Sequence, residues 1–324
     1  MQVLNNTNIS KPVVVVVIEK ESQLENYQLA HNTLACYCKI YGYRLIQFVM
    51  DKSPEMQKLC PQKHIWFQRI CVPMKILQLN PDINYLFFFD ADIGVINPNH
   101  RLEDYINPKY DLSFYERTFT YDIMSGAAII KNTKYAIEFL QDWVKLEDTF
   151  KRDYGTNDQA AIHQVFLDRF YPNHPRKEKC EKIWAKGVVL ADHTPYVACA
   201  RSILNDTLEF DRIIIYPKGS HKAWVRDIWL TGSEWAPRDF LVHDLEQFKI
   251  TNDPELISKE PWWYFPNPFL SDATFHSSRC TFPDGLNCWK YNSTFITSNE
   301  TVDSKIMKKA AEVRQWYLDY LKTV

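Results

Sequence analysis

Two short apolar runs constrain the fold of this chain more than any other feature. One is VVVVVI within KPVVVVVIEK, residues 11–20, and the other is YLFFF at residues 85–89. Both runs are continuous rather than alternating, which is typical of a strand that is buried on both faces. Strands of this kind occur in parallel sheets that have helices on either side. The two runs therefore favour an α/β fold.

The pattern around these runs extends this interpretation. Residues 21–41 have helical spacing and end at Gly42, and a second strand is expected at 43–51, so the chain opens as strand, helix, strand. Further strands are expected at 111–116, 125–132, 187–192, 212–217 and 239–244. Further helices are expected at 64–79 (interrupted by Pro73), 133–150, 157–170 and 302–322.

Alternating strands and helices over most of the length predict one α/β domain with a C-terminal extension. Residues 1–11 form a polar N-terminal segment and residues 12–253 the domain. Residues 254–324 form the extension, rich in proline and aromatic residues and closed by the last helix.

Charge and hydropathy exclude two classes of partner from the given chain. The net charge is −2 over 324 residues, so no global basic field attracts nucleic acid. No apolar run reaches the roughly 18 residues of a membrane span, and the N-terminus has no signal-peptide core. Any membrane anchor is therefore expected to lie outside this sequence.

Sequons and cysteines nevertheless indicate a luminal protein. The eight cysteines are an even number, and Cys280 and Cys288 enclose CTFPDGLNC, a turn-rich segment that can close into a small disulfide loop. N-x-[ST] sequons, which are acceptors for N-glycosylation, occur at Asn5, Asn8, Asn205, Asn292 and Asn299.

Two carboxylates follow the second apolar run directly. Asp90 and Asp92 are separated by one residue, so they point to the same side at the carboxyl end of a buried strand. Ligands of open α/β sheets bind at this edge. Two like charges so close repel each other unless a cation lies between them, and Mg²⁺ and Mn²⁺ prefer oxygen ligands. The pair therefore predicts a divalent-metal site for a phosphorylated ligand.

A strand that ends in D-x-D is typical of two enzyme classes. In dehalogenase-type phosphohydrolases the first Asp is a nucleophile, but their motif has Thr or Val where this chain has Gly94, and it usually opens the domain. The other class is the metal-dependent glycosyltransferases with an A-type fold. The chain has only eight glycines, no G-x-G-x-x-G and no Walker motif, so a metal rather than a glycine loop is expected to hold phosphates.

Three further segments resemble glycosyltransferases. SGAAIIKNTKYAIEFLQDW resembles the strand, asparagine turn and helix that follow the metal site, and GTNDQAAIHQVF resembles the D-Q motif of families 8 and 34. WLTGSEWAPRDFLVHDLEQF resembles the late family-34 segment with a metal-binding histidine. As a whole, residues 12–250 look closest to the nematode hypothetical nucleotide-diphospho-sugar transferase family. The resemblance implies a single Rossmann-like A-type domain with a mixed, mostly parallel sheet.

The resemblance assigns roles to individual residues. Asp90 and Asp92 correspond to the metal and nucleotide contacts and His243 to the third metal ligand, with His221 as a competitor. Expected at the donor are Ser125 and Gly126 along the sugar, Asp158 and Gln159 beside the anomeric carbon as catalytic residues, and Lys222, from GSHKAW, on the diphosphate.

The expected activity is transfer of a hexose from a nucleotide sugar, with a UDP-sugar as the favoured donor, to a glycan or other hydroxyl acceptor. The expected cofactor is Mn²⁺ or Mg²⁺, the expected stereochemistry is retention, and the expected location is the Golgi lumen. PWWYFPNPF, residues 261–269, is either an acceptor groove or a wrap of packing aromatics. A phosphohydrolase, or a sugar- or nucleotide-binding domain without catalysis, stays open as an alternative.

Overall fold

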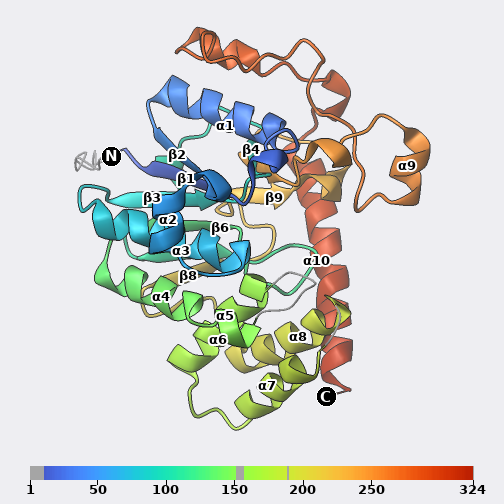
Figure 1. The fold of residues 1–324 in the computed structure, drawn as a ribbon. Helices are drawn as coiled ribbons and strands as arrows, with labels where there is room; N and C mark the ends of the chain where they lie inside the picture. The colour runs from blue at the N-terminus through green and yellow to red at the C-terminus, as the bar shows by residue number, and fades with distance from the viewer. Residues whose placement is uncertain (1–10, 151–156, 188–189, 324) are drawn as a thin grey trace, which may run out of the picture.

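The computed structural model describes residues 11–150, 157–187 and 190–323, and its strands form two sheets (Figure 1). The large sheet has the strand order β2-β1-β3-β6-β5-β8-β7 and the small sheet the order β4-β10-β9. The strands of the large sheet are β1 (Val13–Ile18), β2 (Arg44–Val49), β3 (Tyr85–Phe89), β5 (Leu112–Tyr115), β6 (Ala127–Lys131), β7 (Glu209–Phe210) and β8 (Ile213–Tyr216). Those of the small sheet are β4 (Gly94–Val95), β9 (Val225–Asp227) and β10 (Leu241–His243).

The large sheet is mixed but mostly parallel, as the sequence predicts. Strand β1 pairs in parallel with β2 and β3, and β5 pairs in parallel with β8. Strand β6 is antiparallel to both β3 and β5, and β7 is antiparallel to β8. It follows that β1, β2, β3, β5 and β8 run in one direction and β6 and β7 in the other. The expected α/β fold with a single Rossmann-like sheet is confirmed.

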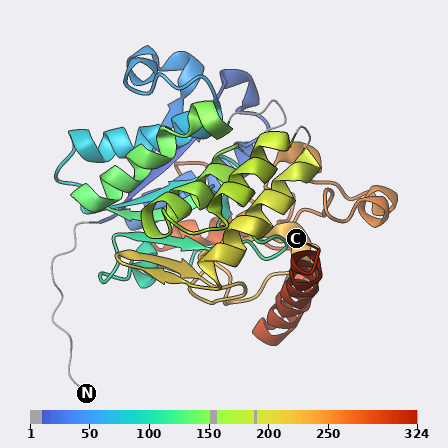
Figure 2. The ribbon, with the colours of Figure 1, turned by 90° about the horizontal axis from the view of Figure 1, so that it is seen from below.

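Helices cover both faces of the large sheet (Figures 1 and 2). Strand β1 explains why, because Val13, Val15 and Val17 pack into one apolar core, while Val14, Val16 and Ile18 pack into another on the opposite face. One core includes α3, α4, α6 and α8, and the other includes α1 and the small sheet. The helices are α1 (Gln28–Tyr41), α2 (Pro54–Leu59), α3 (Ile65–Leu79), α4 (Lys134–Val144), α5 (Glu147–Phe150), α6 (Asn157–Phe170), α7 (Lys177–Lys186), α8 (His193–Leu204), α9 (Pro254–Lys259) and α10 (Asn299–Leu321).

The small sheet is tied to the turn that follows β3. Strand β4 begins two residues after Asp92 and pairs antiparallel with β10, with Gly94 opposite Val242. A side chain at residue 94 does not fit, because its Cβ would lie 2.7 Å from Thr33 Oγ1 and 3.0 Å from the Cα of Ala30. Glycine at this position therefore lets α1 approach the start of β4.

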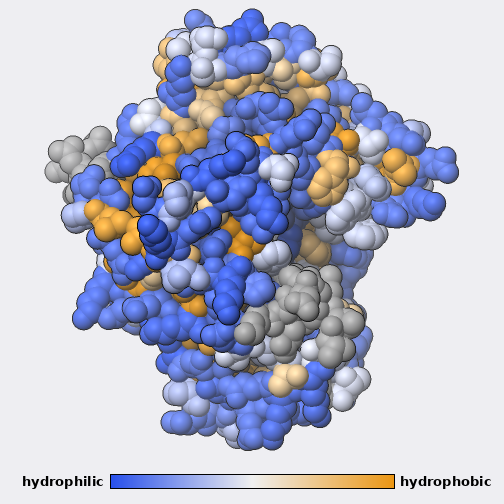
Figure 3. All heavy atoms as spheres, viewed as in Figure 1, coloured by the Kyte–Doolittle hydropathy of each residue, from blue (hydrophilic) through white to orange (hydrophobic). Residues whose placement is uncertain are grey.

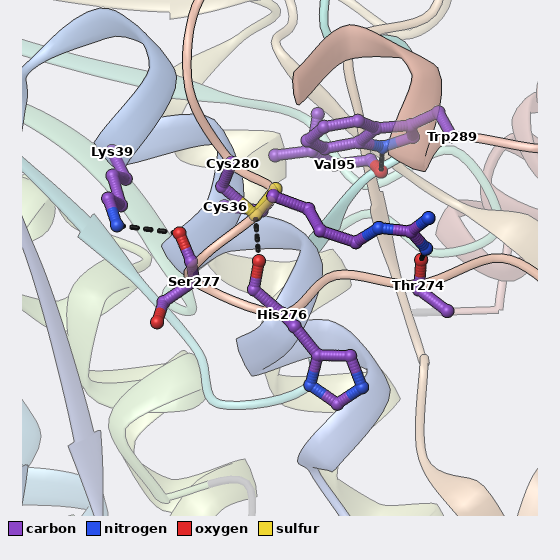
Figure 4. The surroundings of a disulfide bond; sticks show 9 residues. Cys36, Lys39, Val95, Thr274, His276, Ser277, Cys280 and Trp289 are labelled. Atoms are coloured by element: carbon purple, nitrogen blue, oxygen red, sulfur yellow. Dashed lines mark hydrogen bonds between the residues drawn. A yellow bond between two sulfur atoms is a disulfide. The ribbon is translucent and has the colours of Figure 1, made fainter. Parts of the chain in front are cut away.

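The C-terminal extension folds back over α1 and along the side of the molecule. The Cys36–Cys280 disulfide joins it to α1, and beside this bond Lys39 Nζ donates to the Ser277 carbonyl at 2.6 Å (Figure 4). Helix α10, red in Figure 1, places Val313 and Tyr317 in the core that contains α6 and α8. The expected last helix is thus present, while the boundary at 253/254 stays a prediction.

Several expected elements differ in the structure. The strand expected at 187–192 is wrong, because residues 190–192 form a 3-10 helix that leads into α8, while residues 188–189 lie outside the described residues. Periodicity cannot distinguish a short apolar run in a strand from one in a helix. Helix α3 continues through Pro73, without the hydrogen bond that residue 73 would donate to the carbonyl of residue 69. The helix expected over 133–150 is two helices, α4 and α5.

The expected Cys280–Cys288 loop is also wrong. Cys280 pairs with Cys36, which is 244 residues away along the chain, and Cys288 is a buried free thiol. Sequence proximity suggested the loop, but the packing of the extension against α1 brings Cys280 to a different partner. Two other disulfides, Cys60–Cys71 and Cys180–Cys199, join neighbouring elements.

Polar residues predominate on the face shown in Figure 3, where hydrophobic side chains form small separate groups. Among the described residues, no helix combines the length and the apolar character that crossing a bilayer requires. The polar segment at residues 1–10, with the sequons at Asn5 and Asn8, lies outside the described residues.

Candidate functional site

Asp90, Asp92 and His243 come together at the carboxyl end of β3. One possible ligand atom from each of the three lies within 4.8 Å of the others. His243 ends β10, and its Nε2 lies 3.4 Å from Asp92 Oδ1. The pairing of β4 with β10 and the bond from the Leu245 amide to the Asp92 carbonyl, at 2.9 Å, account for this approach. Two carboxylates and one imidazole form a ligand set that suits a divalent cation such as Mn²⁺.

The other ring nitrogen of His243 is held by carboxylates. Nδ1 lies 3.0 Å from Asp227 Oδ1 and 3.1 Å from Asp244 Oδ2. Asp227 ends β9 and is the register partner of His243, and Arg117 Nη2 donates to it at 2.8 Å. An Nδ1–H that donates to these carboxylates orients the ring and leaves Nε2 to face Asp92 and a cation.

The carboxylates of this cluster lie close enough to change one another's pKa and that of His243. Burial and the neighbouring Asp92 raise the pKa of Asp90 to about 6, although Arg69 acts in the opposite direction. Burial opposes the charged form of His243, yet the carboxylates of Asp92 and Asp244 raise its pKa well above the ordinary value. A cation between Asp90 and Asp92 would offset their repulsion and would compete with the proton on His243. The residues present therefore fit a divalent metal.

Arg69 on α3 connects the cluster to the start of α6. Its Nη1 donates to Asp90 Oδ1 at 2.7 Å, and its Nη2 and Nε donate to Asp158 Oδ2 at 2.6 and 2.9 Å. Within the described residues, the other oxygen of Asp158 is buried and has no hydrogen-bond partner. Asp158 lies in the first turn of α6, where the helix dipole favours an anion. Among the described residues, Oδ1 is therefore not bonded to another protein group.

Ser125 and Gly126 lie close to Asp90. They directly precede β6, whose first residue, Ala127, pairs with Phe89 at the end of β3. Strand β6 starts beside the end of β3, and the Asp90 amide donates to the Gly126 carbonyl at 2.8 Å. Gln159 Oε1 accepts from the Ser125 amide at 3.1 Å and from its hydroxyl at 2.8 Å. Gln159 Nε2 donates to the Ile123 carbonyl, so both ends of this amide are bonded to the protein. Gln159 therefore positions Ser125 in this structure.

A cavity of about 200 Å³ opens beside the aspartates. Its walls are the carboxyl end of β1, the residues before α1 with Tyr27, and the first turns of α3 with Trp66 and Arg69. Asp90 and Asp92 also line the cavity. This is the edge of the sheet at which ligands of open α/β proteins bind.

Two predicted residues do not reach the cluster. The exposed Lys222 precedes β9, whereas the cluster lies at its carboxyl end, and its Nζ donates to the Asp104 carbonyl at 3.2 Å. The structure therefore gives no support to the expected contact of Lys222 with a diphosphate. His221 Nε2 lies 3.2 Å from Asp303 Oδ2 of α10, so His221 does not compete with His243.

Sequence reasoning missed Arg69, Asp227 and Tyr27. Arg69 carried a signal, since it is a charged residue within the otherwise largely apolar run of residues 65–77. Asp227 had no such signal in the sequence. Its strand, β9, has only three residues, and its spatial neighbour His243 follows 16 positions later in the chain.

The sheet order and the carboxylate–histidine cluster define the chain as a Rossmann-like α/β protein with a candidate divalent-metal site. Residues 34–259 match the family described as a protein of unknown function, DUF273. The chain belongs to this family. The matched residues contain Asp90, Asp92, Asp158 and His243. No curated protein matches the chain significantly.

Several solved structures have a distant similarity to the chain. A glycosyltransferase involved in the glycosylation of the major capsid of PBCV-1 is 13% identical, with coverage of 72% of this chain and 93% of that one and a TM-score of 0.39. The glycosyltransferase GlyE of Streptococcus pneumoniae TIGR4 is 14% identical, with coverage of 49% and 44% and a TM-score of 0.34. The bifunctional glycosyltransferase WbbM is 12% identical, with coverage of 71% and 49% and a TM-score of 0.33.

Proposed function

We propose that this protein is a metal-dependent glycosyltransferase that uses a nucleotide sugar. The observation that carries the proposal is the group of Asp90, Asp92 and His243, of which the two aspartates line the cavity beside β1. Two hard carboxylates and an oriented imidazole suit Mn²⁺ or Mg²⁺ with substrate phosphates. The resemblance of the sequence to families 34 and 8 supports the same reaction.

In this proposal the cavity holds the nucleoside and the cluster holds the diphosphate. Tyr27 and Trp66 offer aromatic faces to a base, and the metal-binding residues are Asp90, Asp92 and His243. When bound, the metal supplies Lewis-acid stabilisation of the departing diphosphate.

The transferred sugar lies beside the amino end of β6 in this proposal. Asp158 is the catalytic candidate, because its buried Oδ1 has no partner within the described residues and would stabilise positive charge that develops at the anomeric carbon. Arg69 holds its other oxygen, so the carboxylate has one orientation. Gln159 positions Ser125 by accepting a hydrogen bond from its hydroxyl. Gly126 has no side chain, which leaves room for the Asp90 carboxylate.

The finer assignments rest on the sequence resemblance. They are a UDP-hexose as donor, a glycan or glycoconjugate as acceptor, and retention of configuration with the leaving phosphate helping to deprotonate the acceptor hydroxyl. A location in the Golgi lumen is supported by three disulfides within the described residues and by the exposed sequon at Asn205.

Calorimetric titration of UDP into the protein, with Mn²⁺ and then with EDTA, tests the proposal. We expect binding that requires Mn²⁺ and weakens at least about tenfold in His243→Ala, because one of three protein ligands is lost. The matched control is His221→Ala, which removes an exposed histidine paired with α10 and leaves binding unchanged.

Absence of UDP binding in the presence of Mn²⁺ would contradict the UDP-sugar assignment. Hydrolysis of the UDP-sugar without an acceptor would distinguish an enzyme from a binding domain without catalysis. Release of inorganic phosphate from simple phosphomonoesters would favour a phosphohydrolase instead.

A further inference from the structure

A second groove of about 270 Å³ lies between the first turns of α1 and the extension. Its lining on the α1 side includes Gln28 and Asn32, and Gln247 also lines the groove. Segment 267–276 of the extension forms the opposite wall, with the rings of Phe269 and Phe275. Nothing in the proposed transfer reaction assigns a role to this groove.

The lining of this groove selects for uncharged, hydroxyl-rich ligands. Its described lining residues include no Asp, Glu, Lys or Arg, and His276 is the one described lining residue that can carry a charge. Within the described residues, the side-chain amides of Gln28, Asn32 and Gln247 make no hydrogen bond to the protein. Amides beside aromatic rings, which combine fixed hydrogen-bonding groups with apolar faces, suit a ligand with hydroxyl groups and C–H faces.

Covalent and polar contacts hold the outer wall in place. Cys280 is bonded to Cys36 of α1 (Figure 4). In the same segment, Arg279 Nη1 donates to Thr274 Oγ1 at 2.5 Å. The Phe275 ring lies edge-on to Trp289 with centroids 5.0 Å apart, and Trp289 Nε1 donates to the Val95 carbonyl at 2.8 Å. A groove with a wall fixed in this way loses little conformational entropy when a ligand binds.

The groove shares a wall with the candidate site. Tyr27 lines the nucleotide cavity, and its neighbour Gln28 lines the groove. The segment after β10 also contributes to this wall, and its Gln247 backbone amide donates to the Asn26 carbonyl at 2.8 Å. Its neighbour Glu246 lies within 4.8 Å of Asp92. A chain-like ligand in the groove therefore ends close to the cluster.

We propose that this groove binds a neutral saccharide unit of the acceptor, at a distance from the hydroxyl that is attacked. The identification as an acceptor subsite rests on the proposed transfer function. The binding of neutral saccharide does not rest on it, because that follows from the lining alone.

Saturation-transfer NMR with lactose, maltose, cellobiose and mannobiose as probes tests the groove in the absence of nucleotide and metal. We expect at least one disaccharide to bind and to bind about tenfold more weakly in the double variant Asn32→Ala/Gln247→Ala, which removes two hydrogen-bonding amides. The matched control is Gln78→Ala, which removes an exposed amide at the end of α3 and leaves binding unchanged.

The same variant separates the two proposals. Manganese-dependent UDP binding is expected to be unchanged in Asn32→Ala/Gln247→Ala, and the acceptor KM in a transfer assay is expected to rise about tenfold with kcat nearly constant. Failure of all four disaccharides to bind, or equal binding by the double variant, would overturn the saccharide groove. Disaccharide binding by a protein that binds no nucleotide would overturn the acceptor assignment and leave a saccharide-binding groove.

Discussion

At the scale of single residues, Asp90 is held by contacts from two other segments. Arg69 of α3 donates to its carboxylate, and the Gly126 carbonyl accepts from its amide. The Cα of residue 126 lies so close that a Cβ there would be 2.0 Å from Asp90 Oδ2. The position of this carboxylate therefore depends on the absence of a side chain at residue 126.

We predict that Gly126→Ala impairs the cluster without unfolding the protein. The added methyl group displaces the Asp90 carboxylate, so the affinity for UDP with Mn²⁺ is expected to fall about tenfold or more. A loss of about 1.4 kcal/mol of binding free energy is enough for a tenfold change. Calorimetry measures this change, and circular dichroism checks the fold. Unchanged affinity in a folded variant would mean that Asp90 does not contribute to the metal site. Ser125→Ala, which removes only a hydroxyl, is the milder comparison.

His163 on α6 is buried and contacts the backbone of Gln159 and Ile123, near Ser125. Its Nδ1–H donates to the Gln159 carbonyl at 3.0 Å, and its Nε2 accepts from the Ile123 amide at 3.3 Å. Burial lowers the pKa of His163 to about 3, and although Asp122 favours the proton, Arg201 and His193 oppose it.

This shift predicts a pH dependence of stability. Between pH 6.5 and about 3 the unfolded chain binds a proton that the folded His163 does not, so stability is full above pH 6.5 and falls as the pH decreases. His163→Gln lacks this proton uptake. We therefore expect its deficit in unfolding free energy, relative to the unmodified protein, to shrink by about 2 kcal/mol between pH 6.5 and 5. Urea unfolding at both pH values measures it. A constant deficit would show that His163 has the same pKa in the folded and the unfolded protein.

At the scale of elements, length and periodicity decided which segments could be predicted. Strands β1 and β3 are long, continuous apolar runs, and α6 was expected with the bounds it has. Strand β9 has three residues and β4 only two, which is too short for any period. These short strands are nevertheless the ones that bring Asp227 and His243 to Asp92.

The Cys36–Cys280 disulfide predicts a large stability effect at this scale. It closes a loop of 244 residues, so removing it in Cys36→Ser/Cys280→Ser is expected to cost about 3 to 5 kcal/mol. Urea unfolding measures the change. The control Cys288→Ser replaces a neighbouring free thiol and should cost much less. Equal losses in both variants would indicate that packing of the sulfur atoms, rather than the bond, stabilises the extension.

At the scale of the whole molecule, the extension is part of the packed structure. Helix α10 stacks Tyr317 on Tyr121 with ring centroids 3.8 Å apart, and Arg314 Nη2 pairs with Asp206 at 2.9 Å. Trp289 is buried against β4 through its bond to Val95. Contacts from the extension therefore reach β4 of the small sheet and, through α10, the segments that contain Tyr121 and Asp206.

We predict that the chain unfolds in one cooperative transition, because the extension shares its apolar cores with the sheet. Tryptophan fluorescence and far-ultraviolet circular dichroism should report the same midpoint in urea. An earlier fluorescence transition, with most helical signal retained, would instead show that residues 254–324 unfold separately. That result would support the domain boundary predicted at residue 253.

The sequence by itself determined the α/β class, the central strands and the pair of aspartates at the end of β3. These features depend on local rules: continuous apolar runs must be buried, and side chains two residues apart in a strand lie on one face. The tertiary structure alone decided that Arg69 joins Asp90 to Asp158, that Asp227 orients His243, and that Cys280 pairs with Cys36. Each of these contacts joins residues separated by 16 to 244 positions, and no local preference of the chain specifies which distant partner will be near.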